Sequence, residues 1–429
     1  MSQTKPKGNL VAIITMCFIF AMISFVTNMA APFGVIWGNQ YEWSKMAGNL
    51  MNFAAYLFMG IPAGKMLLTV GYKKTTLIAL VTGFVGICIQ YLSSFAFLGQ
   101  AAIYVYLLGA FICGFCVCML NTVVNPSLNS LGGGGNRGNQ LIQTGGTLNS
   151  LTGTLTPLLV GALIGTVTSS TSMSDVAPLL FIAMGVFAIS FIIILFVEIP
   201  EPAKERKNVK FEHSPWNFRH FVMGALAIFF YVGIEIGIPS QVTFYLADAS
   251  ERGAGIAVNG AAIGGAIAAV YWLLMMVGRF SSTLISGKVS TRTQMSVVSA
   301  VAIVLVLVAI FVPKTVTVNM PGYSVADGFA MFEVPLSCLF LVLCGLCTSV
   351  MWGAIFNLAV EGLGKYTEAA SGIFMMLVVG GGIMPFIQEF IAKGAGYMNS
   401  YWLVVAMLAY LLYYAVAGCK NVNKDIPVD

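Results

Sequence analysis

Glu235 is the acidic residue that lies well inside an apolar stretch of this chain. Phe229 to Tyr231 precede it, and Ile236 and Ile238 follow it. A charged side chain inside a bilayer is costly, so one that occurs there is usually functional. Pro239 comes four residues later and cannot donate a helical hydrogen bond to the Glu235 carbonyl. A carboxylate and a free carbonyl at one kink could accept hydroxyl groups of a ligand or bind a cation. The alternative is a structural carboxyl bonded to a neighbouring helix.

Side-chain amides form a second set of polar groups within the apolar stretches. An amide offers two donors and an acceptor, which complements the hydroxyl groups of a sugar ring. The same group can also bond one helix to another, so both interpretations stay open for each residue. The amides are Asn28, Asn121, Asn125, Gln143, Asn149, Gln241, Asn357 and Gln388. Together they favour a polar central cavity. Trp352 could give a pyranose ring an aromatic face, whereas Tyr56 is more readily explained by packing.

The remaining reactive residue types do not form an enzyme or metal site. The two histidines, His213 and His220, lie together near the middle of the chain, and no pair of carboxylates falls inside the apolar stretches. Most of the nine cysteines lie in apolar runs, where a thiol behaves as a small apolar group. We therefore expect no enzyme activity, no cofactor, no metal and no nucleic-acid partner.

The elements that must position these residues are membrane spans. Of the 429 residues, 58% are hydrophobic and only 9% are charged, against about 25% charged in soluble domains. A span needs about 20 apolar residues, so twelve spans with short loops account for nearly the whole chain. The expected starts are near Leu10, Met46, Thr75, Tyr104, Gln140, Ala177, Phe218, Ala261, Met295, Pro335, Ala369 and Tyr401. The sequence thus predicts an all-α membrane protein with the lipid bilayer around it.

A polar segment, residues 198–216, divides the chain nearly in half. We expect an N-terminal six-helix half over residues 1–197, a cytoplasmic linker over 198–216 and a C-terminal six-helix half over 217–429. If the N-terminus is cytoplasmic, all but four of the 21 lysines and arginines fall on the inner side, with Arg279 counted there. The exceptions are Lys45, Arg252, Lys314 and Lys393. The positive-inside rule then places both termini in the cytoplasm.

The two halves repeat one another. Proline follows glycine by four residues in the fifth span, at Gly153 and Pro157, and in the eleventh, at Gly381 and Pro385. The proline leaves the glycine carbonyl without its helical partner, and paired broken helices are typical of transporters built from repeats. Charged glycine motifs end the second and eighth spans, and we expect them to lock the cytoplasmic side. They contain Gly64, Gly71, Lys73, Lys74, Gly278 and Arg279.

Several segments resemble the fucose:proton symporter family of the major facilitator superfamily, which includes glucose/galactose transporters. They include residues 61–64, 71–74, 121–126, 227–236, 276–280, 355–367 and 371–385. The resemblance covers nearly the whole chain and implies the major facilitator fold and sugar uptake across the cytoplasmic (inner) membrane. The family carries acidic residues in the first span and at the start of the fourth-span motif. Here those positions are the neutral amides Asn28 and Asn121.

We therefore expect a transporter of a monosaccharide-like solute (hexose, deoxyhexose or amino sugar) that acts as a monomer by alternating access. Glu235 could couple transport to a proton or to sodium, or transport could be uncoupled. An exporter of apolar compounds and a non-transporting sugar receptor on the same fold are the alternatives.

Overall fold

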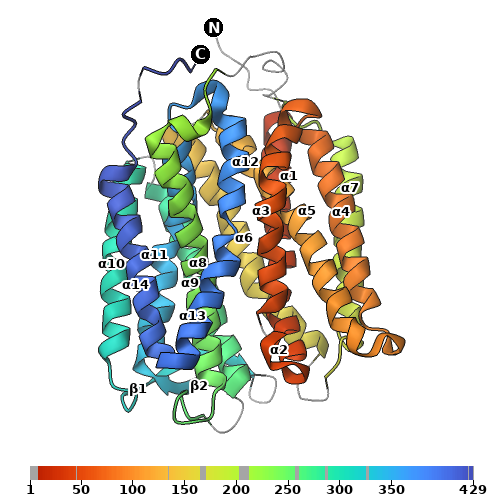
Figure 1. Ribbon diagram of the computed structural model, residues 1–429, viewed down its shortest axis with the longest axis vertical. Coiled ribbons are helices and arrows are strands. Elements are labelled where there is room, and N and C mark those ends of the chain that lie inside the picture. Colours follow the sequence, from red (N-terminus) through yellow and green to blue (C-terminus); the bar gives the residue numbers. More distant parts are fainter. Residues whose placement is uncertain are drawn as a thin grey trace.

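The apolar stretches of the sequence form long helices in the computed structural model (Figure 1). The structure describes residues 8–428 apart from 45, 134, 165–170, 202–211, 257–259, 286–287, 325–327 and 424. Most of the predicted linker therefore lies outside the described residues. Within the described residues, ten helical segments are long and apolar enough to cross a membrane, and α3 and α6 complete the twelve spans. The predicted all-α fold is confirmed.

The helices divide into two groups (Figure 1), and each group contains six of these spans. The N-terminal half contains α1 (Gly8–Asn28), α2 (Ala30–Gln40), α3 (Ala47–Thr69), α4 (Tyr72–Leu92), α5 (Ala102–Leu131), α6 (Gly135–Ile164) and α7 (Ala177–Phe196). The C-terminal half contains α8 (Arg219–Ala247), α9 (Gly260–Ile285), α10 (Thr291–Phe311), α11 (Leu336–Val360), α12 (Thr367–Leu377), α13 (Gly380–Ala395) and α14 (Tyr397–Tyr413). Short helices are η1 (Glu42–Ser44), η2 (Ala96–Ala101), η4 (Pro215–Asn217), η5 (Gly364–Tyr366) and η6 (Tyr414–Gly418).

Two spans are broken. α1 and α2 form the first span and separate at Met29, where Pro32 lies in the first turn of α2. α12 and α13 form the eleventh span and separate at Val378 and Val379. The predicted break in the fifth span, at Gly153 and Pro157, is wrong, because the backbone of α6 is helical from Gly135 to Ile164. The break in the eleventh span precedes Gly381 and Pro385, because α13 is helical from Gly380 to Ala395.

Pro385 does free the Gly381 carbonyl, and the structure shows what that carbonyl binds. Asn49 of α3 donates its Nδ2 to the Gly381 oxygen at 3.1 Å. Proline removes one helical donor, and a side chain of the opposite half replaces it. The proline in α13 therefore supplies a hydrogen bond between the two halves.

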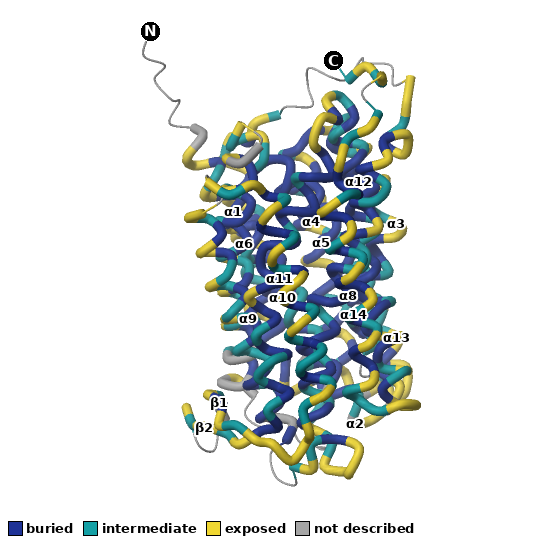
Figure 2. The backbone as a smooth tube through the Cα atoms, turned by 90° about the vertical axis from the view of Figure 1, so that its left-hand side faces the viewer, coloured by how far each residue is buried: buried dark blue, intermediate teal, exposed yellow. Residues whose placement is uncertain are grey.

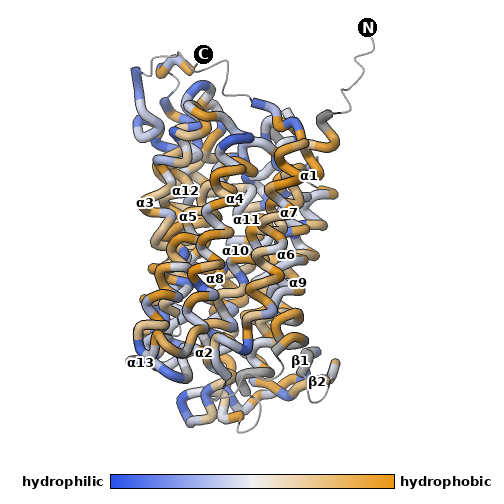
Figure 3. The backbone as a smooth tube through the Cα atoms, turned by 90° about the vertical axis from the view of Figure 1, so that its right-hand side faces the viewer, coloured by the Kyte–Doolittle hydropathy of each residue, from blue (hydrophilic) through white to orange (hydrophobic). Residues whose placement is uncertain are grey.

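Hydrophilic residues gather at the two ends of the bundle, and hydrophobic residues occupy most of the helix lengths between them (Figure 3). Buried residues fill the interior (Figure 2), while large apolar side chains such as Phe196 and Phe390 are exposed, as lipid contact requires. α1 begins, and the described chain ends, at the same end of the bundle (Figure 1). At the opposite end lies an antiparallel hairpin of β1 (Thr317–Ser324) and β2 (Gly328–Pro335), where the sequence had predicted only a loop.

Candidate functional site

Glu235 forms a buried ion pair with Arg279. Arg279 Nη2 of α9 lies 3.1 Å from Glu235 Oε1 of α8, and Tyr231 donates its hydroxyl to the same oxygen at 2.9 Å. The prediction that Arg279 belongs to a cytoplasmic loop is wrong. α9 continues to Ile285, and Arg279 is 5% exposed within it. The sequence suggested a loop because Arg279 lies near the end of an apolar stretch, but α9 extends beyond that stretch.

Arg279 also binds three further groups and connects the two halves. Its Nη1 donates to the Gly146 carbonyl at 2.9 Å and to Asn149 Oδ1 at 3.3 Å, both on α6. Its Nε donates to the Ser349 carbonyl of α11 at 3.2 Å. A guanidinium has five fixed N–H donors, so Arg279 can hold acceptors on several helices at once.

A chain of contacts leads from Glu235 into the N-terminal half. The Tyr231 ring meets the Trp352 ring edge to face, with centroids 6.2 Å apart. Trp352 Nε1 donates to Asn125 Oδ1 at 3.1 Å, and Asn125 Nδ2 donates to the Asn121 carbonyl at 2.9 Å. Asn121 Nδ2 in turn donates to the Tyr56 hydroxyl at 3.0 Å. Tyr56, expected to be packing, therefore contacts a predicted site residue.

We call this connected group the central cluster. It comprises Tyr56, Asn121, Asn125, Asn149, Tyr231, Glu235, Arg279 and Trp352. Gln143 lies beside it and donates to the Val350 carbonyl at 3.2 Å. The cluster joins helices of both halves through polar groups. That these residues bind the substrate remains a prediction.

The structure places four predicted ligands elsewhere. Asn28 donates to the carbonyl and hydroxyl of Ser24 within its own helix. Each of the other three has a partner outside the central cluster, in the pairs Gln241–Glu389 (2.9 Å), Gln388–Ser400 (3.4 Å) and Asn357–Thr291 (3.4 Å). Trp352 and Asn357 therefore belong to different environments, although both lie on α11.

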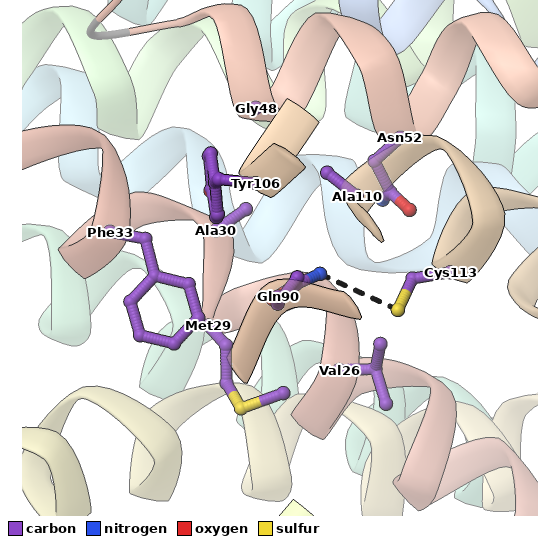
Figure 4. A pocket seen from close by; sticks show the side chains of 10 residues that line it. All are labelled: Val26, Met29, Ala30, Phe33, Gly48, Asn52, Gln90, Tyr106, Ala110 and Cys113. Atoms are coloured by element: carbon purple, nitrogen blue, oxygen red, sulfur yellow. Dashed lines mark hydrogen bonds between the residues drawn. The ribbon is translucent and has the colours of Figure 1, made fainter. Parts of the chain in front are cut away.

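Two cavities also lie outside the central cluster. One, of about 10 Å³, lies within the N-terminal half, where Asn52, Gln90, Tyr106 and Cys113 approach one another (Figure 4). It has room for about one water molecule. The other, of about 810 Å³, lies where α10 begins and α11 ends, and Asn129, Thr291 and Asn357 line it.

The predicted gating residues differ in what they contact. A Cβ on Gly64 would lie 2.9 Å from the Gly372 Cα of α12, so α3 and α12 approach closely there. Gly71 has φ +91° and caps α4, whose first amides, Tyr72 and Lys73, donate to the Glu201 carboxylate at 2.7 and 3.1 Å. Glu201 thus occupies the positive end of a helix dipole.

The other gating residues, Lys73, Lys74 and Gly278, lie in different environments. Lys73 also donates its Nζ to the Leu195 carbonyl at 2.9 Å, and Lys74 is exposed. Gly278 packs against Ser349 within the C-terminal half. Two of the predicted gating residues therefore contact the opposite half. Gly64 lies against α12, and Arg279 bonds to α6 within the central cluster.

Within the described long helices, two carboxylates besides Glu235 are buried or half-buried, and the sequence did not identify them. Glu389 of α13 binds Gln241, and Glu368, in the first turn of α12, is 3% exposed. Glu235 is therefore not the only shielded carboxylate. Both residues lie near charged or polar neighbours in the sequence, and this made them look like residues at span ends.

Comparisons with known proteins agree with this architecture. A family model described as the Major Facilitator Superfamily matches residues 13–385. The chain is 28% identical to the glucose/galactose transporter of Brucella abortus biovar 1 (strain 9-941), over 98% of this chain and 97% of that protein. It is also 28% identical to the putative glucose/galactose transporter of Helicobacter pylori (strain ATCC 700392 / 26695), over 98% of each chain.

A solved structure of the Escherichia coli fucose:proton symporter superposes with a TM-score of 0.74 at 18% identity. The match covers 95% of this chain and 98% of that one. At this identity the likeness shows the fold alone.

Proposed function

Because the chain belongs to the Major Facilitator Superfamily, we propose that it carries a monosaccharide (hexose, deoxyhexose or amino sugar) across the cytoplasmic membrane by alternating access. The observation that supports this most is the central cluster, in which a carboxylate, a guanidinium, amides and aromatic rings meet between the two halves. The relatives named glucose/galactose transporters support the sugar class. We propose that transport is uptake and that the protein acts as a monomer.

The groups of the central cluster suit a polyhydroxyl ligand. Carboxylate oxygens accept sugar O–H groups, while the guanidinium and amide N–H groups donate to sugar oxygens. Asn121 Oδ1 is buried and has no hydrogen-bond partner among the described residues. Because a buried acceptor without a partner is unfavourable, a sugar hydroxyl would bind well there. Trp352 would pack against the ring.

Sugar binding is tested by thermal unfolding of the purified protein with D-glucose, D-galactose and L-fucose. A ligand at about 100 times its Kd stabilises a protein by about 2.7 kcal/mol, so a sugar that binds should raise Tm in a concentration-dependent way. Stabilisation by lipophilic cations instead of sugars would favour an exporter. Sugar binding without flux into proteoliposomes would favour a receptor.

Asn121→Ala should weaken binding of the stabilising sugar about 5- to 150-fold, because a lost hydrogen bond with an unpaired partner costs about 1–3 kcal/mol. Tm titrations measure the affinity. Asn357→Ala is the matched control, since Asn357 lies in the separate cavity beside α10. Equal affinities in wild type and Asn121→Ala would mean that Asn121 only joins helices.

We also propose that the end of the bundle at which α1 begins faces the cytoplasm. A cysteine replacing Phe329, which is 85% exposed on the hairpin at the other end, should react with an impermeant maleimide on whole cells. Lys420→Cys, at an exposed position, should react only after permeabilisation. The nine native cysteines are buried or half-buried, so background labelling should be low. The reverse pattern would invert the orientation.

A further inference from the structure

We propose that Arg279 is the fixed counter-cation of Glu235 and that, for this reason, the transporter moves its sugar without a coupled proton. The inference rests on the proposed function. The question is whether the buried carboxylate is neutralised by a guanidinium of the protein itself or by a proton taken up in each cycle.

The charges around Glu235 balance without a proton. In the part of the chain that the structure describes, the ionisable groups close enough to act on Glu235 are Arg279 of α9 and the phenols of Tyr56 on α3, Tyr231 on α8 and Tyr271 on α9. Phenols are neutral near pH 7, with an ordinary pKa of about 10. One carboxylate and one guanidinium therefore leave the region neutral. A guanidinium stays protonated in proteins, so this compensation is permanent.

Among the described residues, the other helices packed against α8 bring no further charged group to act on Glu235. α11 offers the Ser349 carbonyl and the Thr348 hydroxyl, which contact Arg279 and Tyr271 respectively. On α13, Glu389 accepts a hydrogen bond from Gln241, which lies six residues after Glu235 on α8. On α14, the Tyr401 hydroxyl donates to the Ile238 carbonyl. Glu368, on α12, lies at the start of that helix, where its neighbour Ser371 bonds back to Thr367.

The geometry also holds Arg279 in place. It keeps three acceptors besides Glu235, two of them on α6 of the opposite half. The N-terminal half presents neutral amides to this region, since Asn121 bonds to Tyr56 and Asn149 to Arg279. No described group of the N-terminal half that contacts the cluster can therefore exchange a proton near neutral pH.

Removing the guanidinium should convert the protein into a proton-dependent one. In Arg279→Gln, Glu235 is left in the membrane interior without a counter-charge, and an isolated buried carboxylate is tolerated only when protonated. Acid should then restore part of the uptake rate and of the stability that Arg279→Gln loses. Arg279→Lys keeps a cation and should keep the wild-type pH response, at a lower rate because an ammonium lacks the planar fork.

The experiment uses D-glucose uptake into proteoliposomes from about pH 5.5 to pH 8, with a trapped pH dye. Wild type should change by less than about twofold and show no proton entry with glucose. The uptake rate of Arg279→Gln should be at least tenfold lower at about pH 8 than at about pH 5.5. Glu235→Gln/Arg279→Gln should again be flat.

A readout without sugar separates this inference from the proposed function. The Tm of purified Arg279→Gln should rise as pH falls, relative to wild type, because protonation relieves the unpaired carboxylate, and the double variant should not show this. If wild type neither binds nor moves sugar, the proposed function fails while the Tm comparison still tests the counter-cation. Stoichiometric proton entry with glucose in wild type, or an Arg279→Gln Tm and rate as flat as wild type, would overturn the inference.

Discussion

Glu235→Gln is expected to reduce sugar uptake by about a hundredfold or more and to lower the free energy of unfolding by about 3–5 kcal/mol. The substitution keeps the shape of the side chain but leaves Arg279 as a buried cation without its partner, and breaking a buried pair costs about that much. A loss of about 1.4 kcal/mol in binding is tenfold in affinity. Proteoliposome uptake and thermal unfolding measure the two effects.

The second substitution identifies the cause. Glu235→Gln/Arg279→Gln removes both charges and should recover much of the lost stability, because the coupling energy of a contacting pair appears in a double-mutant cycle. Glu389→Gln is the matched control, since Glu389 is a half-buried carboxylate bound to Gln241 outside the central cluster. It should leave uptake within about twofold of wild type, as a neutral amide pair replaces a charge-assisted bond.

Exchange of bound sugar distinguishes an ion-pair role from a proton-carrying role. If Glu235 only carried a proton, Glu235→Gln would abolish accumulation and leave exchange intact. If Glu235 instead holds Arg279 and the sugar, net uptake and exchange should fall together. Exchange at the wild-type rate in Glu235→Gln would contradict the ion-pair role.

The sequence predicted the existence of the spans and most of the polar residues that meet in the central cluster, but not how the helices turn. Apolarity over about 20 residues is a property of composition, so the twelve spans could be read directly. Which face of a span points inward could not, because lipid-facing and core-facing positions are both apolar. Asn121 and Asn125 are four residues apart and lie on one face. Trp352 and Asn357 are five apart, which turns them about 140° from one another.

The partner of Glu235 was missed for a related reason. Arg279 lies on another helix, and the pairing depends on the relative depth of α8 and α9, which hydropathy does not give. The length of α9 mattered as well, because counting Arg279 as a loop residue removed it from the set of buried charges. A signal was present, since a lone arginine directly after Gly278, with no further charge before Lys288, is costly in a bilayer unless paired.

Gly60→Val is expected to abolish net uptake while leaving a folded protein, because it separates α3 from α12. A Cβ on Gly60 would lie 2.5 Å from the Met376 nitrogen and 2.7 Å from the Gly372 carbonyl oxygen. Both are backbone atoms, so only movement of a whole helix makes room. Small residues four apart, here Gly60 and Gly64, let membrane helices approach closely. α3 and α12 belong to opposite halves, and on the proposed orientation their contact closes the cytoplasmic side.

If that contact must form and break in each cycle, a protein that cannot form it should remain open at this end. Hydrogen exchange should therefore become faster in α12, residues Thr367–Leu377, than in wild type, while Tm changes much less than in Glu235→Gln. Gly185→Val in α7 is the matched control, because a Cβ there meets nothing within 4 Å, and it should transport normally. Normal uptake by Gly60→Val would mean that α3 and α12 need not touch for transport, and the closing contact would then have to be sought between α6 and α9, where Gln140 already donates to the Thr283 carbonyl at 3.2 Å.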